Sequence, residues 1–596
     1  MRRIILPVCS AIVFHMAPLL VAAPINIVWI VIEDASPHLG CYGETAVSTP
    51  IIDQLARDGI RCTSAFVTAP VCSPSRSAMV SGMYQMTLGA HNHRSQIESG
   101  KGGGNRLYFD SYRVPQTIKL IPQLFAEAGY YVTNRSKTDY NFVAPEKLYR
   151  SSNWKDAEAD QPIFAQFQLK GGKNRNAASY ADPATVTLPP YYPDDPVLRQ
   201  DWAKYLDSWV QTDKDVAAIL SDLQAAGRLD STAIFLWTDH GVSHVRGKQF
   251  LYDEGIHVPM IVRLPGNANA GTLRNDIIQH IDVAAASLAL ADIDIPDYVQ
   301  GRDFLAADHT ARQFVFSGRD RCDETVDIIR AVRNSRYKYI RNFMSHVPQT
   351  QPSQYKDGKK IMQTMRKLHA AGKLTDIQAR PFAPQRPPEE LYDLQKDPHE
   401  LVNLATSPQH AKRVTAMRGV LYNRMLDIRD MGLIPEPILE DAGLHAGSKY
   451  HAFKGEGKTA QTKRLIAVIT AGEAGDSNAL LEFADSRDPS TRYWAAVWLG
   501  VNRSGRGTLQ KLIADDIPAV RVAAAQALVK LGDKIQLRLL IDHIDDPNLL
   551  VGMYALRAVE ELGDAGKTYR AQIAAAQKSP YEFSRRIARR LTGKWK

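Results

Sequence analysis

The sequence predicts an α/β fold: a mostly parallel sheet sandwiched by helices, then a smaller α+β subdomain, then an all-α region of helical repeats. Two near-continuous apolar runs, INIVWIVI from Ile25 and TAIFLWT from Thr232, are typical of parallel strands that are buried on both faces. Helical segments alternate with strands along this half of the chain. Near the C-terminus, Ala-rich helical segments with the same pattern of residues recur.

The alternation of strands and helices follows directly from the first apolar run. TPIIDQLARDGI predicts a helix and CTSAFV the next strand, and IPQLFAEAGYYVTNRS repeats helix, glycine turn and strand. DWAKYLDSWVQTDKDVAAILSDLQAAG predicts a long amphipathic helix that leads into the TAIFLWT strand. We expect one α/β domain over residues 24–311.

Two further regions follow this domain. The short segments RQFVFSGRDR, DIIRAVRNSRYKYIRNF and EELYDLQ predict a smaller antiparallel-sheet subdomain over 312–435. Segments such as DPSTRYWAAVWLGV and DIPAVRVAAAQALVKLGD then recur about every thirty residues, with Pro in the first helical turn. They predict HEAT-like helical repeats over 455–596, with an irregular helical bundle as the alternative. Either would pack on the chain itself or on a protein partner.

The bulk composition gives only broad limits. A chain of 596 residues is too long for one core, so two or three domains are expected. The formal charge of +9 suits a polyanionic partner, although many soluble proteins are mildly basic. No stripe of Lys and Arg with interleaved aromatic residues is present, so nucleic acid is not an expected partner.

The N-terminus predicts export. Met1-Arg2-Arg3 precedes an apolar run from Ile4 to Val21, and Ala22-Ala23 supplies small residues for cleavage. Residues 1–23 are therefore interpreted as a signal peptide, and the mature chain as periplasmic or secreted. An uncleaved membrane anchor is the alternative.

The cysteines do not form a disulfide framework. Cleavage of the signal peptide would leave Cys41, Cys62, Cys72 and Cys322, which show neither framework nor zinc spacing. A bridge between Cys41 and Cys62 remains open. Cys72 stands apart because Ser-Pro-Ser-Arg follows it.

The residues after Cys72 predict an anion site at a helix N-terminus. Ser73 is the expected N-cap and Pro74 fits the first turn, which leaves free N–H groups and the positive dipole end for an anion. Arg76 adds a planar guanidinium. Cys72 in this setting could be an activated nucleophile.

Cys72-Ser73-Pro74-Ser75-Arg76 resembles the C-x-P-S-R signature of the type I sulfatases, which belong to the alkaline phosphatase-like superfamily. The similarity covers roughly Asn26 to Leu404. It implies that a formylglycine-generating enzyme converts Cys72 to formylglycine (3-oxoalanine). One hydroxyl of the hydrated aldehyde would attack sulfur, and loss of a proton from the other would expel sulfate. Arg76 would orient this group.

The resemblance also implies a divalent cation, usually Ca²⁺, with Mg²⁺ as the other choice. Glu33-Asp34 and Asp239-His240 each follow an apolar strand and match the family's two ligand pairs, with Cys72 beside the ion. Glu33 stands where Asp is usual, and His240 stands where many members have Asn.

Two lysines match the residues that bind sulfate in the family. Lys137 lies in SKTD, which resembles G-K-W-H, and Lys248 lies in RGKQFLYDEGIHVP, which is similar to G-K-x-x-L-Y-E-x-G-x-x-V-P. Asp139 and Lys173 replace the family's usual histidines, so the general acid is unassigned. Its candidates, which could also bind substrate, are His91, His93, His244 and Lys173.

EDASPHLGCYG and GRDRCDETVDIIRAVRNSRYKYIRN resemble glycan sulfatases, in a branch similar to heparan N-sulfatases. The resemblance implies hydrolysis of sulfate esters or N-sulfate groups in a sulfated polysaccharide or glycosaminoglycan. Asp320 and Arg321 are either sugar contacts or a structural ion pair. The alternatives are a phosphate or phosphonate ester hydrolase of the same superfamily and a catalytically silent protein that binds sulfated glycans.

Overall fold

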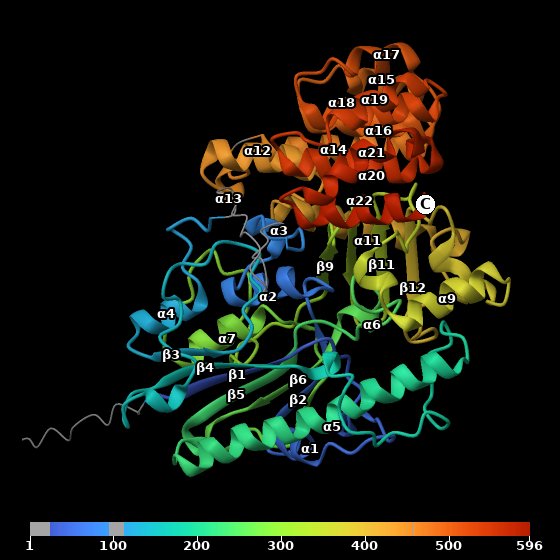
Figure 1. Ribbon diagram of the computed structural model, residues 1–596. Helices are drawn as coiled ribbons and strands as arrows, with labels where there is room; N and C mark the ends of the chain where they lie inside the picture. Colours follow the sequence, from blue (N-terminus) through green and yellow to red (C-terminus); the bar gives the residue numbers. More distant parts are fainter. Residues whose placement is uncertain (1–23, 95–112, 456, 596) are drawn as a thin grey trace, which may run out of the picture.

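The computed structural model describes residues 24–94, 113–455 and 457–595, and the predicted signal peptide lies outside these ranges. Its larger sheet has the order β3-β4-β1-β5-β6-β2-β7, with β8 paired to β2 (Figure 1). The first four strands are parallel, and β6 is antiparallel to both of its neighbours. The strands are β1 (Asn26–Ile32), β2 (Ile60–Phe66), β3 (Tyr131–Arg135), β4 (Ile163–Leu169), β5 (Thr232–Thr238), β6 (His257–Arg263), β7 (Thr272–Arg274) and β8 (Ile278–Gln279).

Strand β1 is buried along its whole length because it lies in the centre of the sheet and both faces are covered. Ile27, Trp29 and Val31 face one core, and the alternate residues face the other. Helices α2 (Cys72–Ser81), α4 (Ile121–Glu127) and α7 (Asp282–Leu290) cover the first face. Helices α1 (Pro50–Arg57) and α5 (Pro196–Ala225) cover the second. The predicted α/β sandwich is confirmed.

The two cores explain why Cys41 and Cys62 are not bridged. Both thiols are free, together with those of Cys72 and Cys322. Cys62 is buried in the core of the first face, whereas Cys41 packs against the core of the second. The sheet therefore separates the two sulfur atoms, and the open disulfide alternative is wrong.

A second, antiparallel sheet has the order β12-β11-β10-β9. Its strands are β9 (Val315–Arg319), β10 (Ile329–Arg333), β11 (Tyr337–Asn342) and β12 (Glu389–Asp393), and α11 (Ala411–Asp427) packs on β10 and β11. Three helices, α8 (Gln354–Asp357), α9 (Lys360–Ala370) and α10 (Asp376–Ala379), lie in the connection from β11 to β12. The remaining helices before the repeats are α3 (Gln85–Leu88), α6 (Asp253–Ile256), α12 (Glu436–Ala446) and α13 (Lys449–Ala452).

The C-terminal region is a stack of paired helices. Asp488 and Asn548 cap α16 and α20, and successive long helices of the repeat pack on one another. Figure 1 shows α22 at the base of the stack, against the body of the molecule. The helices are α14 (Lys458–Glu473), α15 (Ser477–Ala484), α16 (Pro489–Val501), α17 (Arg506–Leu512), α18 (Pro518–Lys530), α19 (Leu537–Asp542), α20 (Leu549–Glu561), α21 (Arg570–Ala575) and α22 (Glu582–Lys594).

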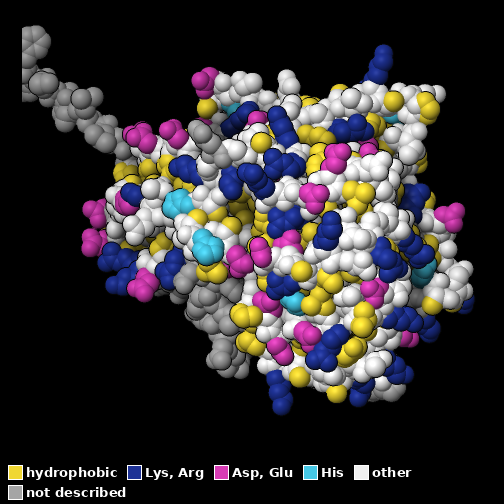
Figure 2. Space-filling view, turned by 90° about the horizontal axis from the view of Figure 1, so that it is seen from above, with side chains coloured by type: hydrophobic (Ala, Val, Ile, Leu, Met, Phe, Trp, Pro, Cys, Tyr) yellow, Lys and Arg dark blue, Asp and Glu magenta, His cyan; other side chains and the backbone are white. Residues whose placement is uncertain are grey.

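Two general properties concern the molecular surface. Within the described ranges, no helix combines the length and the apolar character that a membrane span requires. Figure 2 looks down on the molecule from the repeat side and shows Lys and Arg side chains gathered near the middle of this face, with Asp and Glu among them.

Candidate active site

Three parallel strands end level with one another and present the candidate site. Ile32 at the end of β1 pairs with Leu169 of β4 and with Thr238 of β5. The predicted pairs Glu33-Asp34 and Asp239-His240 therefore emerge side by side at the carboxyl edge of the sheet. Asp34 has a positive φ of 55°, and its N–H donates to Oδ1 of Asp239 at 3.1 Å.

Cys72 is the first residue of α2, and the N-cap is Val71 in extended backbone. The prediction of Ser73 as N-cap is therefore wrong by two positions. The Oγ of Ser73 lies inside the first turn and accepts the N–H of Arg94 at 3.2 Å instead. The first turn closes from the N–H of Ser75 to the carbonyl of Val71, which puts the Cys72 side chain at the positive end of the helix.

The Cys72 sulfur is buried among polar groups. Its Sγ lies 3.1 Å from Nζ of Lys248, 3.2 Å from Nε2 of His240, and 3.8 Å from both Nζ of Lys173 and Oδ1 of Asp34. A thiol is a weak hydrogen-bond donor and a weak acceptor, so it forms few strong hydrogen bonds with these four polar neighbours. The position suits a group with hydroxyl oxygens, which donate and accept stronger hydrogen bonds than a thiol sulfur.

The charges around Cys72 favour an anion. Burial opposes ionisation of the Cys72 thiol, but Lys137, Lys173, Lys248 and His240 together hold its pKa well below the usual range. Burial likewise disfavours the charged form of Lys248, yet the carboxylate of Asp34 and the Cys72 group raise its pKa well above the usual value. The pocket is therefore electropositive at the sulfur.

Four of the predicted cation ligands converge. Single ligand atoms of Asp34, Cys72, Asp239 and His240 all lie within 4.8 Å of one another, and all four residues are buried. Nδ1 of His240 lies 2.9 Å from the carbonyl of Gly241, so Nδ1–H donates there and Nε2 faces the carboxylates. Burial disfavours the charged ring, but Asp239 and Asp34 raise the pKa of His240 to about 9. A divalent cation bound by the two carboxylates would take the place of the Nε2 proton.

Glu33, the fifth predicted ligand, lies outside this group of four. Its carboxylate accepts from Nζ of Lys137 at 2.9 Å and from Nζ of Lys173, and it lies 4.0 Å from Arg76. Arg76 is fully buried and binds Oδ2 of Asp239 through Nε at 3.0 Å and Nη2 at 2.9 Å. Glu33 thus neutralises the cationic side of the pocket.

The two residues that replace the family's usual histidines, Lys173 and Asp139, differ in their contacts with the sulfur. Lys173 contacts Cys72 directly, as described above, and burial fails to lower its pKa because Cys72 and Asp34 raise it well above the usual value. Asp139 binds Arg94 at 3.2 Å and Nζ of Lys137 at 3.0 Å. Of the four general-acid candidates, only Lys173 has a contact with Cys72 among the described interactions.

The three candidate histidines are buried elsewhere. Nε2 of His244 lies 2.9 Å from Asp201, and Nδ1 of His93 lies 3.3 Å from Asp323. Burial, together with Arg330 and Lys449, holds the pKa of His91 well below the usual range.

Asp320 and Arg321 form buried ion pairs, which is the structural one of the two alternatives. Nη2 of Arg330 donates to Oδ1 of Asp320 at 2.9 Å. Arg321 binds both carboxylate oxygens of Glu436, at 2.5 and 3.0 Å. Both residues are at most 3% exposed, so neither side chain faces solvent.

Sequence reasoning missed two residues beside the site. The amide oxygen of Gln168 accepts from Nη1 of Arg76, and its place as a polar residue in the apolar run IFAQFQL was an available signal. The ring of Tyr355 lies 5.2 Å from Nζ of Lys248. No sequence signal points to Tyr355, because it comes from a distant connection in the second sheet.

Comparison with known proteins shows which family has a sequence like that around the Cys72 site. The family model described as "Sulfatase" matches residues 25–293. A protein from Formosa agariphila named ulvan-active sulfatase is 31% identical over 459 residues, which are 69% of this chain and 76% of that protein. This chain belongs to the sulfatase family. The predicted recognition is confirmed.

Two more family models match regions that lie further along the chain of this sulfatase. The model "N-sulphoglucosamine sulphohydrolase, C-terminal" matches 240–383, and "HEAT repeats" matches 477–567, so the predicted HEAT-like region is confirmed. Human N-sulphoglucosamine sulphohydrolase is 22% identical over 503 residues, which are 73% of the sulfatase described here and 96% of the human protein.

Solved structures share the fold. A 2-O GAG sulfatase superimposes with a TM-score of 0.51 at 20% identity, covering 68% of this sulfatase and 93% of that chain. A phosphonate monoester hydrolase from Silicibacter pomeroyi gives a TM-score of 0.50 at 16% identity, covering 69% and 97%. Because a phosphonate hydrolase shares the fold, the fold alone does not separate the two chemistries.

Proposed function

We propose that this sulfatase hydrolyses sulfate esters or N-sulfate groups of a sulfated polysaccharide at Cys72. The observation that carries the proposal is the cluster of cationic groups at that residue: Lys173 and Lys248 lie beside its sulfur, and Lys137 acts with them to lower its pKa. Arg76 binds the neighbouring carboxylate of Asp239. A sulfate group presents negative oxygen atoms in several directions, and ammonium and guanidinium groups stabilise them in a water-poor pocket.

The proposal includes conversion of Cys72 to formylglycine. Four polar groups surround a thiol that can use few of them, and the two hydroxyls of a hydrated aldehyde would use more. When formed, this group supplies one oxygen to attack sulfur and a second whose deprotonation releases sulfate.

Asp34, Asp239 and His240 would hold a divalent cation, either Ca²⁺ or Mg²⁺. The ion would supply a positive charge for a sulfate oxygen. Arg76 keeps the Asp239 carboxylate in place from its far side, and Lys248 does the same for Asp34 at 3.0 Å.

The exposure of the side chains indicates how substrate reaches Cys72. Cys72 is 1% exposed, and the side chain of Lys248 is 4% exposed. The side chains of Lys137 and Lys173 are 20% and 34% exposed. The sugar therefore approaches on the side of Lys137 and Lys173, and these two lysines meet the sulfate first.

The substrate class rests on relatives. The relatives reported above are named for sulfatase activity on ulvan and for hydrolysis of N-sulphoglucosamine, so both names describe a sulfated carbohydrate. The net charge of +9 and the basic side chains on the face in Figure 2 suit such a substrate.

The proposal also includes export of the protein. Residues 1–23 would be a cleaved signal peptide, because a polysaccharide substrate lies outside the cell. N-terminal sequencing of the protein from the periplasm or the medium tests the cleavage.

The decisive experiment measures modification and turnover together. The full chain is co-expressed with a formylglycine-generating enzyme, the Cys72 peptide is analysed by mass spectrometry, and sulfate release is assayed. The substrates are ulvan, heparan, chondroitin and carrageenan oligosaccharides beside phosphate and phosphonate esters, with Cys72→Ala as the matched control. Sulfate release from one glycan class supports the proposal. Turnover confined to phosphate or phosphonate esters contradicts it, as does binding of a glycan without release by the modified protein.

A further inference from the structure

The backbone that carries Lys248 is held by a buried lysine from α8. Nζ of Lys356 donates to the carbonyls of His244 at 2.7 Å, Val245 at 3.2 Å and Lys248 at 2.8 Å. Lys356 is 4% exposed, and burial together with Lys359 lowers its pKa. The three carbonyl acceptors favour the charged form, because only the ammonium group has one hydrogen for each of the three oxygens. Lys356 thus ties both ends of the 244–248 segment to one point.

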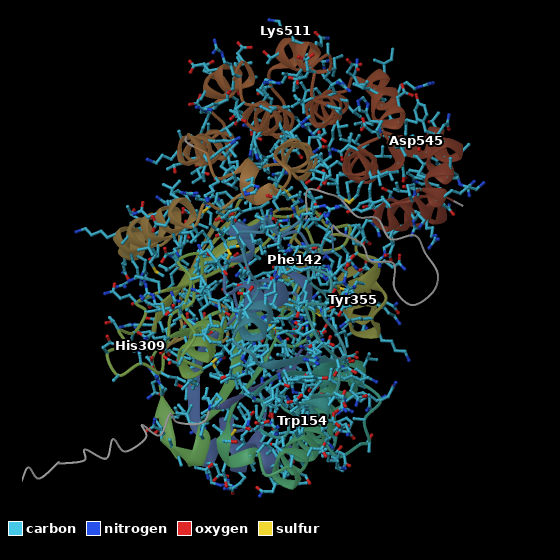
Figure 3. The ribbon with its side chains drawn as sticks, turned by 90° about the vertical axis from the view of Figure 1, so that its left-hand side faces the viewer. Phe142, Trp154, His309, Tyr355, Lys511 and Asp545 are labelled. Carbon is cyan, nitrogen blue, oxygen red and sulfur yellow. The ribbon has the colours of Figure 1, made fainter. Side chains whose placement is uncertain are left out.

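Two neighbours of Lys356, Tyr355 and Lys359, contact this segment or Ser243 directly before it. The Tyr355 hydroxyl lies 2.8 Å from Oγ of Ser243, and its ring lies 5.2 Å from Nζ of Lys248. Nζ of Lys359 donates to the carbonyl of Ser243 at 2.7 Å and to its Oγ at 2.6 Å. Figure 3 shows Tyr355 on its segment below the C-terminal helices. Residues 355–359 therefore pack against the loop that carries Lys248 and hold its backbone by hydrogen bonds.

The start of α8 is held in turn by the helical repeats. Oε1 of Glu324 accepts the N–H of Gln354, the first residue of α8, at 2.6 Å. The fully buried Glu324 also accepts from Nη1 of Arg590 at 2.9 Å and lies 3.5 Å from Nη1 of Arg586, both on α22. A second link joins Nη2 of Arg557 on α20 to Oε1 of Gln351 at 2.7 Å.

We propose that Lys356 is a positioning residue for Lys248, and that the helical repeats hold α8 in place for it through Arg586 and Arg590 on Glu324. The contacts form one continuous path from α22 through Glu324, α8 and the 244–248 carbonyls to Nζ of Lys248 beside Cys72. The repeat region is then part of the active-site architecture. Only the activity readout of this proposal rests on the proposed function.

The physical reason is the cost of unpaired buried groups. Removal of the Lys356 ammonium leaves three carbonyl oxygens without that donor, which favours opening of the loop to water. The loop also carries two amides that report on opening, since the N–H of Lys248 donates to Val242 and that of Gln249 to Pro70, each at 2.8 Å.

The first test compares Lys356→Met with Lys360→Met, an exposed lysine four residues further on. Lys356→Met is expected to speed hydrogen exchange at the Lys248 and Gln249 amides and to lower kcat/KM about tenfold to a hundredfold. Lys360→Met changes neither, and Lys356→Arg, which keeps the charge, recovers part of the loss. In a Lys248→Met background, Lys356→Met is expected to cost less than about threefold, because its effect passes through Lys248.

The second test changes the far end of the path. Arg586→Met combined with Arg590→Met is expected to speed exchange over residues 353–359 and to lower kcat/KM, whereas the exposed Arg589→Met does neither. Unchanged exchange at the Lys248 and Gln249 amides in folded Lys356→Met would overturn the proposal, as would full additivity with Lys248→Met. Exchange is readable in Cys72→Ala protein without turnover, so failure of the sulfatase assay leaves this test intact.

Discussion

Nζ of Lys248 lies 3.1 Å from Sγ of Cys72 and 3.0 Å from Oδ2 of Asp34, so one ammonium group joins the reactive position to a cation ligand. The three residues come from a loop, a helix start and a strand end that are far apart in the chain. This arrangement defines the chemistry of the pocket, because the Lys248 ammonium group stabilises negative charge both at position 72 and on the Asp34 carboxylate.

Lys248→Met is expected to lower kcat/KM about a hundredfold to a thousandfold, the usual cost of losing one donor to a developing charge. It also leaves Asp34 without its nearest cation. Lys170→Met, an exposed lysine after β4, is the matched control and should change kcat/KM by less than about twofold. Steady-state assays with the preferred glycan check this. Equal activity of the two variants would remove Lys248 from the mechanism.

Lys173→Met is expected to lower kcat/KM without removing a limb of the pH–rate profile. Cys72 and Asp34 raise the pKa of Lys173 against the effect of burial, so the ammonium stays charged across the working range. Lys173→His should instead add a limb, with activity falling as pH rises through the new imidazole pKa. Loss of an existing limb in Lys173→Met would identify Lys173 as the titrating acid.

Asp34→Asn and Glu33→Gln should differ in their need for Ca²⁺. Asp34 belongs to the group of four converging ligands, whereas Glu33 binds Lys137 and Lys173. After chelation, Asp34→Asn is expected to need at least about tenfold more Ca²⁺ for half-maximal binding. Glu33→Gln should stay within about threefold of the unaltered protein. Calorimetric titration measures both constants, and reversed ranks would make Glu33 the ligand.

His280 is expected to make the fold sensitive to acid. Nδ1 of this fully buried ring accepts the N–H of Thr68 at 3.1 Å, and Nε2 lies 3.1 Å from the carbonyl of Ser75. Burial lowers the pKa of His280 to about 4. Between the unfolded value of about 6.5 and this value the unfolded chain binds the extra proton, so stability falls as pH decreases, by on the order of 3 kcal/mol.

Denaturant unfolding at about pH 7 and pH 4 checks this acid dependence. His280→Gln should reduce the loss of stability between the two pH values, whatever its stability at pH 7. The exposed His445→Gln serves as the control. An unchanged pH dependence in His280→Gln would assign the effect to other groups.

Gly172→Ala is expected to damage the site. A Cβ at Gly172 would lie 2.0 Å from the backbone oxygen of Asp34, so either Asp34 or the turn before Lys173 must move. We expect about 1–3 kcal/mol of destabilisation and a fall in kcat/KM of about a hundredfold. Gly419→Ala, in open space within α11, should raise stability by up to about 1 kcal/mol. Thermal melts and kinetics together test the pair.

Short-range patterns explain which parts of the fold could be predicted. Both central strands and the long helix α5 appear where the apolar periodicity places them, because burial on both faces or on one stripe leaves a direct trace in the sequence. The start of α2 was misplaced by two residues. Cap preferences are weak, and here the chain enters the helix from extended backbone at Val71.

The sequence by itself determined the local chemistry of this protein: the Cys72 motif, the acidic pairs at two strand ends, Lys137 and Lys248, and the repeat scheme. Only the tertiary structure decided which of these groups meet. It separated Glu33 from the converging ligands, buried Asp320 and Arg321 in ion pairs, and brought Tyr355 and Lys356 behind Lys248. The physical reason is range, since propensity and periodicity act within one element, whereas contacts between distant elements depend on how whole faces pack.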